Sequence, residues 1–258
     1  MKIISSRDNR YIKDCIKLKM RKYRDITGLF VIEGKRMMEE LIACPDLKIR
    51  HVFIEESVAN DYDLEVFNSE VFLINSKLMA EISDTDNPQG ILAVVEQPIW
   101  NKENLKKDAS VLVLLDGITD PGNMGTIIRT SWVFNVDGVL LTSGCVDPYS
   151  HKVVRSTMGG ILNIPIFRNI TISDIEDLTA ANFSLLGSTV NDAKKYYEYD
   201  FTIPTIIIIG SEGQGMSSSL AKRCHDLITI PINPNADSLN AGVACGIILS
   251  EVLRQRDD

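Results

Sequence analysis

Uninterrupted apolar runs in the second half of the chain constrain the fold more than any other feature of the sequence. These runs are VLVLLDG (111–117), GVLLTSG (138–144), FSLLGST (183–189) and IPTIIIIG (203–210). A strand that is buried on both faces needs such a run, because neither face reaches water. Helical patterns over residues 123–134, 150–158 and 238–254 separate the runs. The alternation predicts an α/β domain built on a parallel sheet.

Residues 1–97 carry a different pattern, in which shorter strands alternate with amphipathic helices. We predict a basic helix over residues 9–23 and a second helix over residues 35–43, whose apolar side comprises Met37, Met38, Leu41 and Ile42. Strands are predicted at residues 29–34, 51–54, 71–74 and 91–95. Residues 98–110 contain proline, asparagine and charge without an apolar period, which is typical of a linker. We therefore expect a first domain at 1–97, a linker at 98–110 and a second domain at 111–258.

The charge of the chain is unevenly distributed. The whole chain has a net charge of −8, yet residues 1–36 hold eleven Lys and Arg against four Asp and Glu. Binding to phosphates requires local basic surface rather than a basic average. A solvated helix face that is basic without any ligand explains the same pattern, so charge alone leaves both interpretations open.

The cysteines and the N-terminal sequence narrow the class of protein further. The five cysteines include no CxxC pair and the chain has three histidines, so we expect neither a disulfide framework nor a metal site. The N-terminal sequence MKIISSRDNR has no apolar signal core, and the longest aliphatic run, residues 206–209, is too short to span a bilayer. We expect a cytoplasmic protein with reduced thiols and no membrane segment.

The segment LDGITDPGNMGTIIRTS (115–131) joins the end of a predicted strand to a predicted helix. Asn123 is a residue type that caps helices, and a buried stripe at i, i+3, i+4 and i+7 follows, formed by Met124, Ile127, Ile128 and Ser131. Arg129 lies off this stripe, on the same face as Gly125, near the strand end where α/β sheets bind ligands. A surface arginine and a capping asparagine without further function remain the alternative.

The segment GSEGQG (210–215) follows a buried strand directly. Its glycines allow the backbone to approach a ligand closely, but the spacing is neither GxGxxG nor that of a phosphate loop. Because the carboxylate of Glu212 would repel a phosphate, a cationic or hydroxyl-bearing ligand suits this loop better. A tight connection with a solvated glutamate explains the segment equally well.

The segment IPINPNADSLNAGVACG (230–246) contains a polar loop after a short strand, and then a helix that we predict to be capped by Ser238. Small residues crowd the start of this helix: Ala241, Gly242, Ala244, Cys245 and Gly246. They cost helix stability unless another backbone packs closely against them. We expect a tight helix–helix contact here, either within the domain or across a dimer interface.

Taken together and in this order, the three segments resemble the three motifs of the SpoU (TrmH-type) RNA ribose methyltransferases of the SPOUT superfamily. DPGNMGTIIRTS (120–131) resembles the first motif, GSEGQGMS (210–217) the second and IPINPNADSLNAGVACGI (230–247) the third. SSRDNRYIKDCIKLKMRKYR (5–24), FVIEGKRMMEEL (30–41) and NPQGILAVVEQP (87–98) are similar to the family's ribosomal-protein-like RNA-binding extension. The resemblance therefore covers nearly the whole chain.

The resemblance implies a fold, a cofactor and a set of site residues. The second domain should contain a C-terminal trefoil knot, bind S-adenosylmethionine and form a homodimer through the knot region. The family's functional side chains map onto Asn123, Arg129, Glu212, Ser238 and Asn240. The cofactor should lie near Ser188, Thr189, Gly210, Gly213, Gly215, Ile230 and Leu239. The candidates for binding structured RNA are Arg7, Arg10, Lys13, Lys17, Arg21, Lys22, Arg24, Lys35 and Arg155.

The expected activity is transfer of a methyl group from S-adenosylmethionine to a ribose 2′-OH of RNA. Ribosomal RNA is the preferred substrate because the first domain resembles a ribosomal protein. A transfer-RNA ribose methyltransferase and a non-catalytic RNA-binding module remain alternatives. A dinucleotide-dependent oxidoreductase is disfavoured, because GxGxxG is missing.

Overall fold

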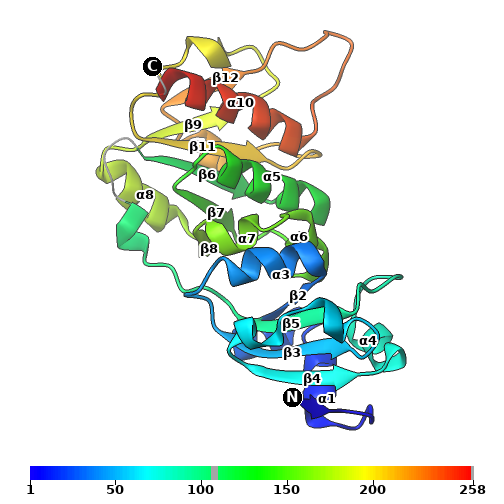
Figure 1. The fold of residues 1–258 in the computed structure, drawn as a ribbon. Coiled ribbons are helices and arrows are strands. Elements are labelled where there is room, and N and C mark those ends of the chain that lie inside the picture. Colours follow the sequence, from blue (N-terminus) through cyan, green and yellow to red (C-terminus); the bar gives the residue numbers. More distant parts are fainter. Residues whose placement is uncertain (106–109, 257–258) are drawn as a thin grey trace. The chain divides into compact units, whose positions relative to one another are not determined.

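The computed structural model describes residues 1–105 and 110–256 (Figure 1). Contacts divide the chain into two compact units, Met1–Ile99 with Asp147–Leu162 and Trp100–Val146 with Asn163–Asp258. Residues 147–162 thus group with the first unit, although the sequence-based boundary assigned them to the second domain. Residues 106–109 of the expected linker and the last two residues of the second domain lie outside the described residues.

The first unit is built on a five-stranded mixed sheet with the order β1-β4-β3-β5-β2. The strands are β1 (Lys2–Ile3), β2 (Leu29–Glu33), β3 (Ile49–Glu55), β4 (Glu70–Ile74) and β5 (Ile91–Glu96). Its helical segments are α1 (Arg10–Lys17), α2 (Arg21–Thr27), α3 (Lys35–Ile42), α4 (Ser76–Ile82), α6 (His151–Ser156) and the short turns η1 (Ala59–Asp61) and η2 (Leu64–Phe67). The four predicted strands are confirmed with small changes at their ends.

The predicted basic helix over residues 9–23 is wrong in one respect, because two helices occupy this region. Asn9 caps α1 by accepting from the backbone N–H of Tyr11, and the buried Ile12 and Cys15 face the core. Met20 has an extended backbone, which ends the first helical segment and starts α2 in a new direction. In α3 the expected apolar side is buried except for Ile42, which is 42% exposed.

The second unit is built on a seven-stranded sheet in which all neighbouring strands are parallel, as predicted. The strand order is β10-β12-β9-β11-β6-β7-β8. The strands are β6 (Val111–Asp116), β7 (Gly138–Thr142), β8 (Ile166–Ile170), β9 (Ser184–Ser188), β10 (Lys194–Lys195), β11 (Thr205–Gly210) and β12 (Asp226–Thr229). The central β6 and β11 are buried along nearly their whole length, which confirms that their apolar runs are strands covered on both faces.

Helices cover both faces of this sheet (Figure 1). They are α5 (Pro121–Val133), α8 (Ile172–Ala180), α9 (Ser218–Ala221) and α10 (Ala241–Arg256). The short turns η3 (Lys102–Leu105) and η4 (Tyr196–Glu198) also belong to this unit, whereas the short helix α7 (Gly160–Asn163) ends the segment that groups with the first unit. Ile175 and Leu178 of α8 share a buried cluster with Leu114 of β6 and Ile208 of β11. Since side chains alternate along a strand, the intervening residues point to the other face, where α5 and α10 pack side by side.

The small residues at the start of α10 make a contact within the domain. A Cβ added to Gly242 would lie 2.8 Å from Cγ2 of Thr126 on α5, and one added to Gly246 would lie 3.7 Å from Cγ2 of Thr130. The first position therefore holds the two helices at a distance that only glycine permits. Of the two contacts expected from the sequence, the structure contains the one between helices of the same domain.

Burial affects the thiols of this protein. None of the five cysteines, all of which lie within the described residues, forms a disulfide. Burial raises the pKa of Cys15 and Cys245 to about 12 and that of Cys224 to about 11, so these thiols are protonated near neutral pH.

Within the described parts of the chain, no three His, Cys, Asp or Glu side chains come together in a way that could hold a metal ion. None of the helices described is both long and apolar enough to cross a membrane.

Candidate functional site

The C-terminal ends of the central strands meet at one edge of the second sheet. Gly210 at the end of β11 pairs with Asp116 at the end of β6, and Ser188 at the end of β9 pairs with Ile228 of β12. The loops that follow these strands therefore start side by side. This edge of a parallel α/β sheet is where ligands usually bind.

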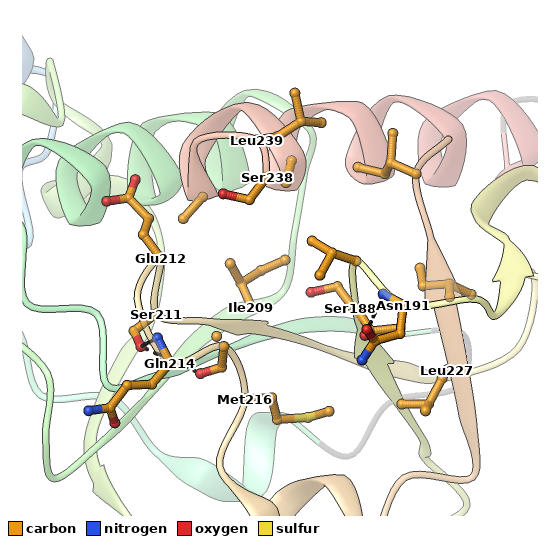
Figure 2. Close-up of a pocket in the computed structure, with 18 of the residues that line it drawn as sticks. Ser188, Asn191, Ile209, Ser211, Glu212, Gln214, Met216, Leu227, Ser238 and Leu239 are labelled. Carbon is orange, nitrogen blue, oxygen red and sulfur yellow. Dashed lines mark hydrogen bonds between the residues drawn. The ribbon is translucent and has the colours of Figure 1, made fainter. Parts of the chain in front are cut away.

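A cavity of about 550 Å³ opens at this edge (Figure 2). Its wall is formed by residues 188–191 at the end of β9, residues 209–216 at the end of β11 and in the loop that follows, and residues before and within the first half of α10. Around the end of β12 the lining residues are Leu227, Ile228, Ile230 and Ile232. The volume is in the range of sites that bind small molecules and cofactors. All seven predicted cofactor residues lie in this wall: Ser188, Thr189, Gly210, Gly213, Gly215, Ile230 and Leu239.

The loop 211–215 folds back on the end of its own strand. Ser211 and Gly215 exchange backbone hydrogen bonds of 3.1 and 2.7 Å. A Cβ on Gly210 would lie 2.3 Å from the carbonyl carbon of Gly215 and from the backbone nitrogen of Met216, so no larger residue fits there without moving the loop. Gly215 has φ +65°, a conformation that favours glycine. The glycines of this motif thus shape the cavity wall through the backbone.

Three of the predicted catalytic side chains form a closed hydrogen-bonded triangle, the Asn123–Glu212–Asn240 triangle. Asn123 Nδ2 donates to Oε1 of Glu212 at 2.6 Å, and Asn240 Nδ2 donates to the same oxygen at 3.0 Å. Asn240 Nδ2 also donates to Oδ1 of Asn123 at 2.7 Å. One residue comes from each of the three sequence motifs, so the triangle joins segments that are far apart in the chain. Glu212, for which the sequence left two roles open, is thereby held in place rather than free in solvent.

The structure corrects the two helix caps that were predicted near this triangle. Asp120, not Asn123, caps α5: its Oδ1 accepts from the backbone N–H of Asn123 at 2.8 Å, and Pro121 occupies the first turn. Asn240, not Ser238, caps α10, because its Oδ1 accepts from the N–H groups of Gly242 and Val243 at 2.9 and 3.2 Å. Since Oδ1 of Asp120 caps α5 and Oδ1 of Asn240 caps α10, the Nδ2 groups of Asn123 and Asn240 are available to donate within the triangle.

The remaining predicted side chains lie around the triangle and the cavity. Ser238 is exposed and lines the cavity. Ser188 donates its hydroxyl to the carbonyl of Ile208 at 2.7 Å, and Thr189 Oγ1 accepts from the N–H of Asn191 at 3.1 Å, so both hold the shape of the wall.

Arg129 lies on the exposed side of α5, off the buried stripe, as predicted. Within residues 1–105 and 110–256 it has neither a hydrogen-bonding nor an ionic partner, and it does not line the cavity. Thr126, three residues before Arg129, packs against the start of α10. Arg129 therefore lies on a neighbouring part of the surface of α5. Its guanidinium is free to bind an anion.

Sequence reasoning missed an aspartate that supports the loop of the second motif. Asp116 Oδ2 accepts from the backbone N–H of Ser217 at 2.7 Å, while its Oδ1 accepts from the hydroxyl of Thr142 at 3.2 Å. The side chain thus ties the end of the glycine loop to the ends of β6 and β7. The strand pattern alone contained no signal for this, because a polar residue at a strand end is ordinary. The cap at Asp120, by contrast, was signalled by the Asp-Pro pair at 120–121.

Most of the predicted RNA-binding cations lie on or near α1 and α2, exposed and weakly paired. Arg7 pairs with Glu81, Lys13 with Asp8, Lys17 with Asp14 and Arg21 with Asp25, at distances between 2.7 and 3.4 Å. Arg10 lies over the ring of Tyr11 at 4.6 Å. Lys22, Lys35 and Arg155 are exposed and, among the described residues, have no ionic partner. Such surface pairs contribute little, so phosphates can displace the acids.

Arg24 does not fit this set, and its prediction as an RNA contact is corrected. Its side chain is 4% exposed and paired with Asp147, which is equally buried. A guanidinium in this position cannot reach a phosphate at the surface. The cause is the break at Met20, which turns α2 so that Arg24 faces the protein interior.

Known proteins are similar to this chain in sequence and in fold. A family model described as the SpoU rRNA Methylase family matches residues 110–250, and one described as an MRM3-like substrate binding domain matches residues 9–93. The 23S rRNA (guanosine(2553)-2′-O)-methyltransferase RlmP of Bacillus subtilis (strain 168) is 30% identical over 249 residues, which cover 96% of this chain and 98% of the relative.

Solved structures agree along nearly the whole chain. The AdoMet-bound rRNA methyltransferase from Sinorhizobium meliloti has a TM-score of 0.87 and 30% identity, covering 98% of this chain and 97% of that one. The SpoU methyltransferase AviRb from Streptomyces viridochromogenes in complex with AdoMet has a TM-score of 0.87 and 26% identity, covering 97% and 99%. They confirm the predicted parallel-sheet methyltransferase domain preceded by a substrate-binding domain. This chain belongs to the SpoU rRNA methylase family.

Proposed function

We propose that this protein is an S-adenosylmethionine-dependent methyltransferase that methylates a ribose 2′-OH of RNA, with ribosomal RNA as the substrate. The observation that carries the proposal is the Asn123–Glu212–Asn240 triangle at the mouth of a cofactor-sized cavity. It unites all three motifs of the family in one site. RlmP and the Sinorhizobium meliloti protein, which align over nearly the whole chain, are named as rRNA methyltransferases. The structures of the Sinorhizobium meliloti protein and of AviRb contain AdoMet.

The cavity fits S-adenosylmethionine in its chemistry as well as its size. Ile209, Leu227, Ile230 and Leu239 offer apolar surface for a flat heterocycle, next to backbone polar groups of the glycine loop. Glu212 and Asp237 bring carboxylates to a ligand that carries a sulfonium and an ammonium group. The cofactor supplies an activated methyl carbon, so the protein's task is mainly alignment. The residues that would hold it are Ser188, Thr189, Gly210, Gly213, Gly215, Ile230 and Leu239.

The unpaired guanidinium of Arg129 is suited to the RNA side of the reaction. It binds the phosphate next to the target ribose and stabilises negative charge that develops on the 2′ oxygen. A guanidinium stays protonated in proteins, so Arg129 acts as an electrostatic stabiliser rather than as a base. Asn123, fixed by Glu212 and Asn240, orients the ribose, and Ser238 contributes a hydroxyl at the cavity mouth.

The first unit binds the RNA substrate. Its exposed cations on α1 and α2, with Lys35 on α3 and Arg155 on α6, attract phosphates, which is how proteins recognise folded RNA. A transfer RNA remains the alternative substrate. A non-catalytic RNA-binding module is the alternative function, but the intact set of polar side chains at the cavity argues against it.

Three further properties belong to this proposal. The protein forms a homodimer through the region of the packed helices α5 and α10, where Val133 and Val243 are 60% and 51% exposed. The family's trefoil knot in the second unit and a cytoplasmic location beside the ribosomal RNA complete it. We propose no resident metal ion.

The test is methyl transfer from radiolabelled S-adenosylmethionine to RNA from bacteria that lack this gene. Wild-type protein should label ribosomal RNA at one ribose whose neighbouring phosphodiester becomes resistant to alkali. Arg129→Ala should lower the rate by roughly 10²- to 10³-fold while cofactor binding persists. Lys222→Ala, which removes an exposed charge from the same unit, serves as the matched control and should keep the wild-type rate.

Two outcomes would change the proposal. Label on transfer RNA alone would replace the substrate and retain the chemistry. Absence of both label and cofactor binding in a folded wild-type protein would leave the non-catalytic RNA-binding module.

A further inference from the structure

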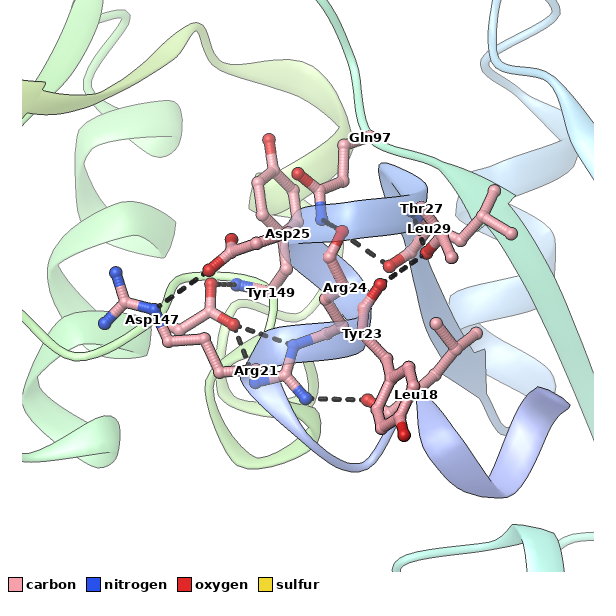
Figure 3. Close-up of polar contacts among 10 residues, drawn as sticks. All are labelled: Leu18, Arg21, Tyr23, Arg24, Asp25, Thr27, Leu29, Gln97, Asp147 and Tyr149. Carbon is pink, nitrogen blue, oxygen red and sulfur yellow. Dashed lines mark hydrogen bonds and ion pairs between the residues drawn. The ribbon is translucent and has the colours of Figure 1, made fainter. Parts of the chain in front are cut away.

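Arg24 is turned inward from the cations that surround it in sequence. Its Nε and Nη2 donate to Oδ2 of Asp147 at 2.7 and 2.6 Å (Figure 3). Both side chains are 4% exposed. Because a buried charge is costly without a partner, these two groups require each other.

The same guanidinium closes the corner between α1 and α2. Its Nη1 donates to the carbonyl oxygen of Leu18 at 2.7 Å, at the point where α1 ends. Gln97 Nε2 donates to the backbone carbonyl of Arg24 at 3.3 Å. A single side chain thus joins the end of α1, the helix α2 and the loop at Asp147, as Figure 3 shows.

Asp147 is itself anchored on the segment that leads to α6. Its Oδ1 accepts from the N–H of Tyr149 at 3.1 Å, and the ring of Tyr149 lies 5.0 Å from that of Phe30 on β2. Four residues after Asp147, α6 begins, and it carries the exposed Arg155. The Arg24–Asp147 pair therefore links two stretches of chain that both carry predicted RNA-binding cations.

We propose that Arg24 is a positioning residue for RNA binding, an inference that rests on the proposed function. The Arg24–Asp147 pair holds the α1–α2 corner against residues 147–149, which fixes Lys17, Arg21 and Lys22 relative to each other. Phosphates of a folded RNA have a set spacing, so prearranged cations lose less freedom on binding. Arg24 itself touches no RNA.

The salt dependence of RNA binding separates positioning from phosphate contact. Each phosphate that a protein neutralises contributes about −0.9 to the slope of log K against log salt on duplex nucleic acid. Arg24→Met should weaken binding to transcribed bacterial 23S rRNA about tenfold without changing that slope. Lys22→Ala, on the same helix but exposed, should instead make the slope shallower by about 0.9.

The double variant Arg24→Met with Asp147→Asn keeps the experiment decisive if a single variant fails to fold. It removes both buried charges, while the asparagine oxygen can still accept from Tyr149 N–H. Because replacing both members of a buried pair is tolerated far better than removing one, the double variant should recover to within about threefold of wild type. S-adenosylmethionine affinity should stay at the wild-type value in every variant.

Specific results would overturn the inference. If Arg24→Met makes the slope shallower by about 0.9 and the double variant stays as weak as the single, Arg24 is a phosphate ligand after all. If Arg24→Met binds RNA as wild type does, the pair has no part in RNA recognition. Failure of the wild-type protein to bind any RNA would contradict the proposed function instead, so the two failures are distinguishable.

Discussion

At the C-terminal edge of the second sheet, Asn123, Glu212 and Asn240 are joined by hydrogen bonds of 2.6 to 3.0 Å. On α1, by contrast, Lys13 and Lys17 each face one acid in solvent, and either pair can open at little cost. The first region fixes atoms, as chemistry at a single ribose oxygen requires. The second collects charge, as binding to a large polyanion requires.

Substitutions should therefore have larger effects in the first region than in the second. A closed network over a cavity transmits a small displacement to the reacting atoms, and a shift of about 1 Å can cost roughly 100-fold in rate. Several exposed cations bind the RNA together, so the loss of one of them should lower RNA affinity only by the contribution of that cation.

Gly210→Ala should have the largest effect. The added methyl carbon would lie 2.3 Å from backbone atoms of Gly215 and Met216, so the whole loop must move. We expect a loss of roughly 100-fold or more in S-adenosylmethionine affinity and in kcat/KM, measured by calorimetry and by methyl transfer.

Gly213→Ala is the comparison for that variant, because an added Cβ there meets nothing within 4 Å and the loop is the same. Its loss should be smaller by at least about tenfold. Equal losses in the two variants would mean that mobility of the loop, and not its close approach to the strand, controls cofactor binding.

Asn240→Asp should come next, because it keeps the helix cap and breaks the triangle. The carboxylate can still accept from Gly242 and Val243, but it places negative charge where an amide now donates to Glu212 at 3.0 Å. We expect kcat to fall roughly 10- to 100-fold, with a smaller change in S-adenosylmethionine affinity and little change in thermal stability. A fall in stability as large as that of Asn240→Ala, with kcat unchanged, would show that Asn240 serves only as a cap.

Asp116→Asn should produce an intermediate effect on the cofactor alone. The amide keeps one acceptor oxygen and loses the negative charge, so the charge-assisted bond from Ser217 N–H, which holds one end of the glycine loop, becomes weaker. Roughly a tenfold loss of S-adenosylmethionine affinity should result. Asp137→Asn is the matched control, because Asp137 Oδ2 accepts from Val111 N–H at 2.8 Å at the opposite end of the same strand. It should destabilise the protein similarly and leave the affinity intact.

The strands β6, β7, β9 and β11 of the second unit could be predicted from the sequence, because each is a short apolar run that is separated from the next by a helical pattern or a turn. The five-residue strand β8 and the helix α8 were missed, since IFRNI and ISDIEDLTA contain too many polar residues for a buried run. The helix over residues 9–23 was predicted as continuous because Met20 is an acceptable helix residue. Its extended backbone is accompanied by the bond from Nη1 of Arg24 to the carbonyl of Leu18, and Arg24 is in turn held by Asp147, a partner that the local sequence does not contain.

The candidate site, like the fold, could be predicted only in part from the sequence. Motif order and a family resemblance identified Asn123, Glu212 and Asn240, but only the structure shows which atom of each makes a cap and which joins the triangle. The inward turn of Arg24 could not be predicted either, because its partner Asp147 is 123 residues away. Long-range pairing of single polar residues leaves no periodicity to detect.

Lys13→Ala should have the smallest effect, because Lys13 is one of several exposed cations and no part of the Asn123–Glu212–Asn240 triangle. Lys13 pairs with Asp8 at 2.8 Å, and this partner holds the pKa of the Asp8 carboxyl below its usual value, so Asp8 stays charged near neutral pH and competes with phosphate. We expect RNA binding to weaken roughly fivefold near physiological salt, less at higher salt, with S-adenosylmethionine affinity unchanged. Asp8→Asn removes the competitor and should strengthen RNA binding by roughly two- to threefold. A loss near 100-fold for Lys13→Ala would mean that α1 positions one phosphate as tightly as the triangle positions its amides.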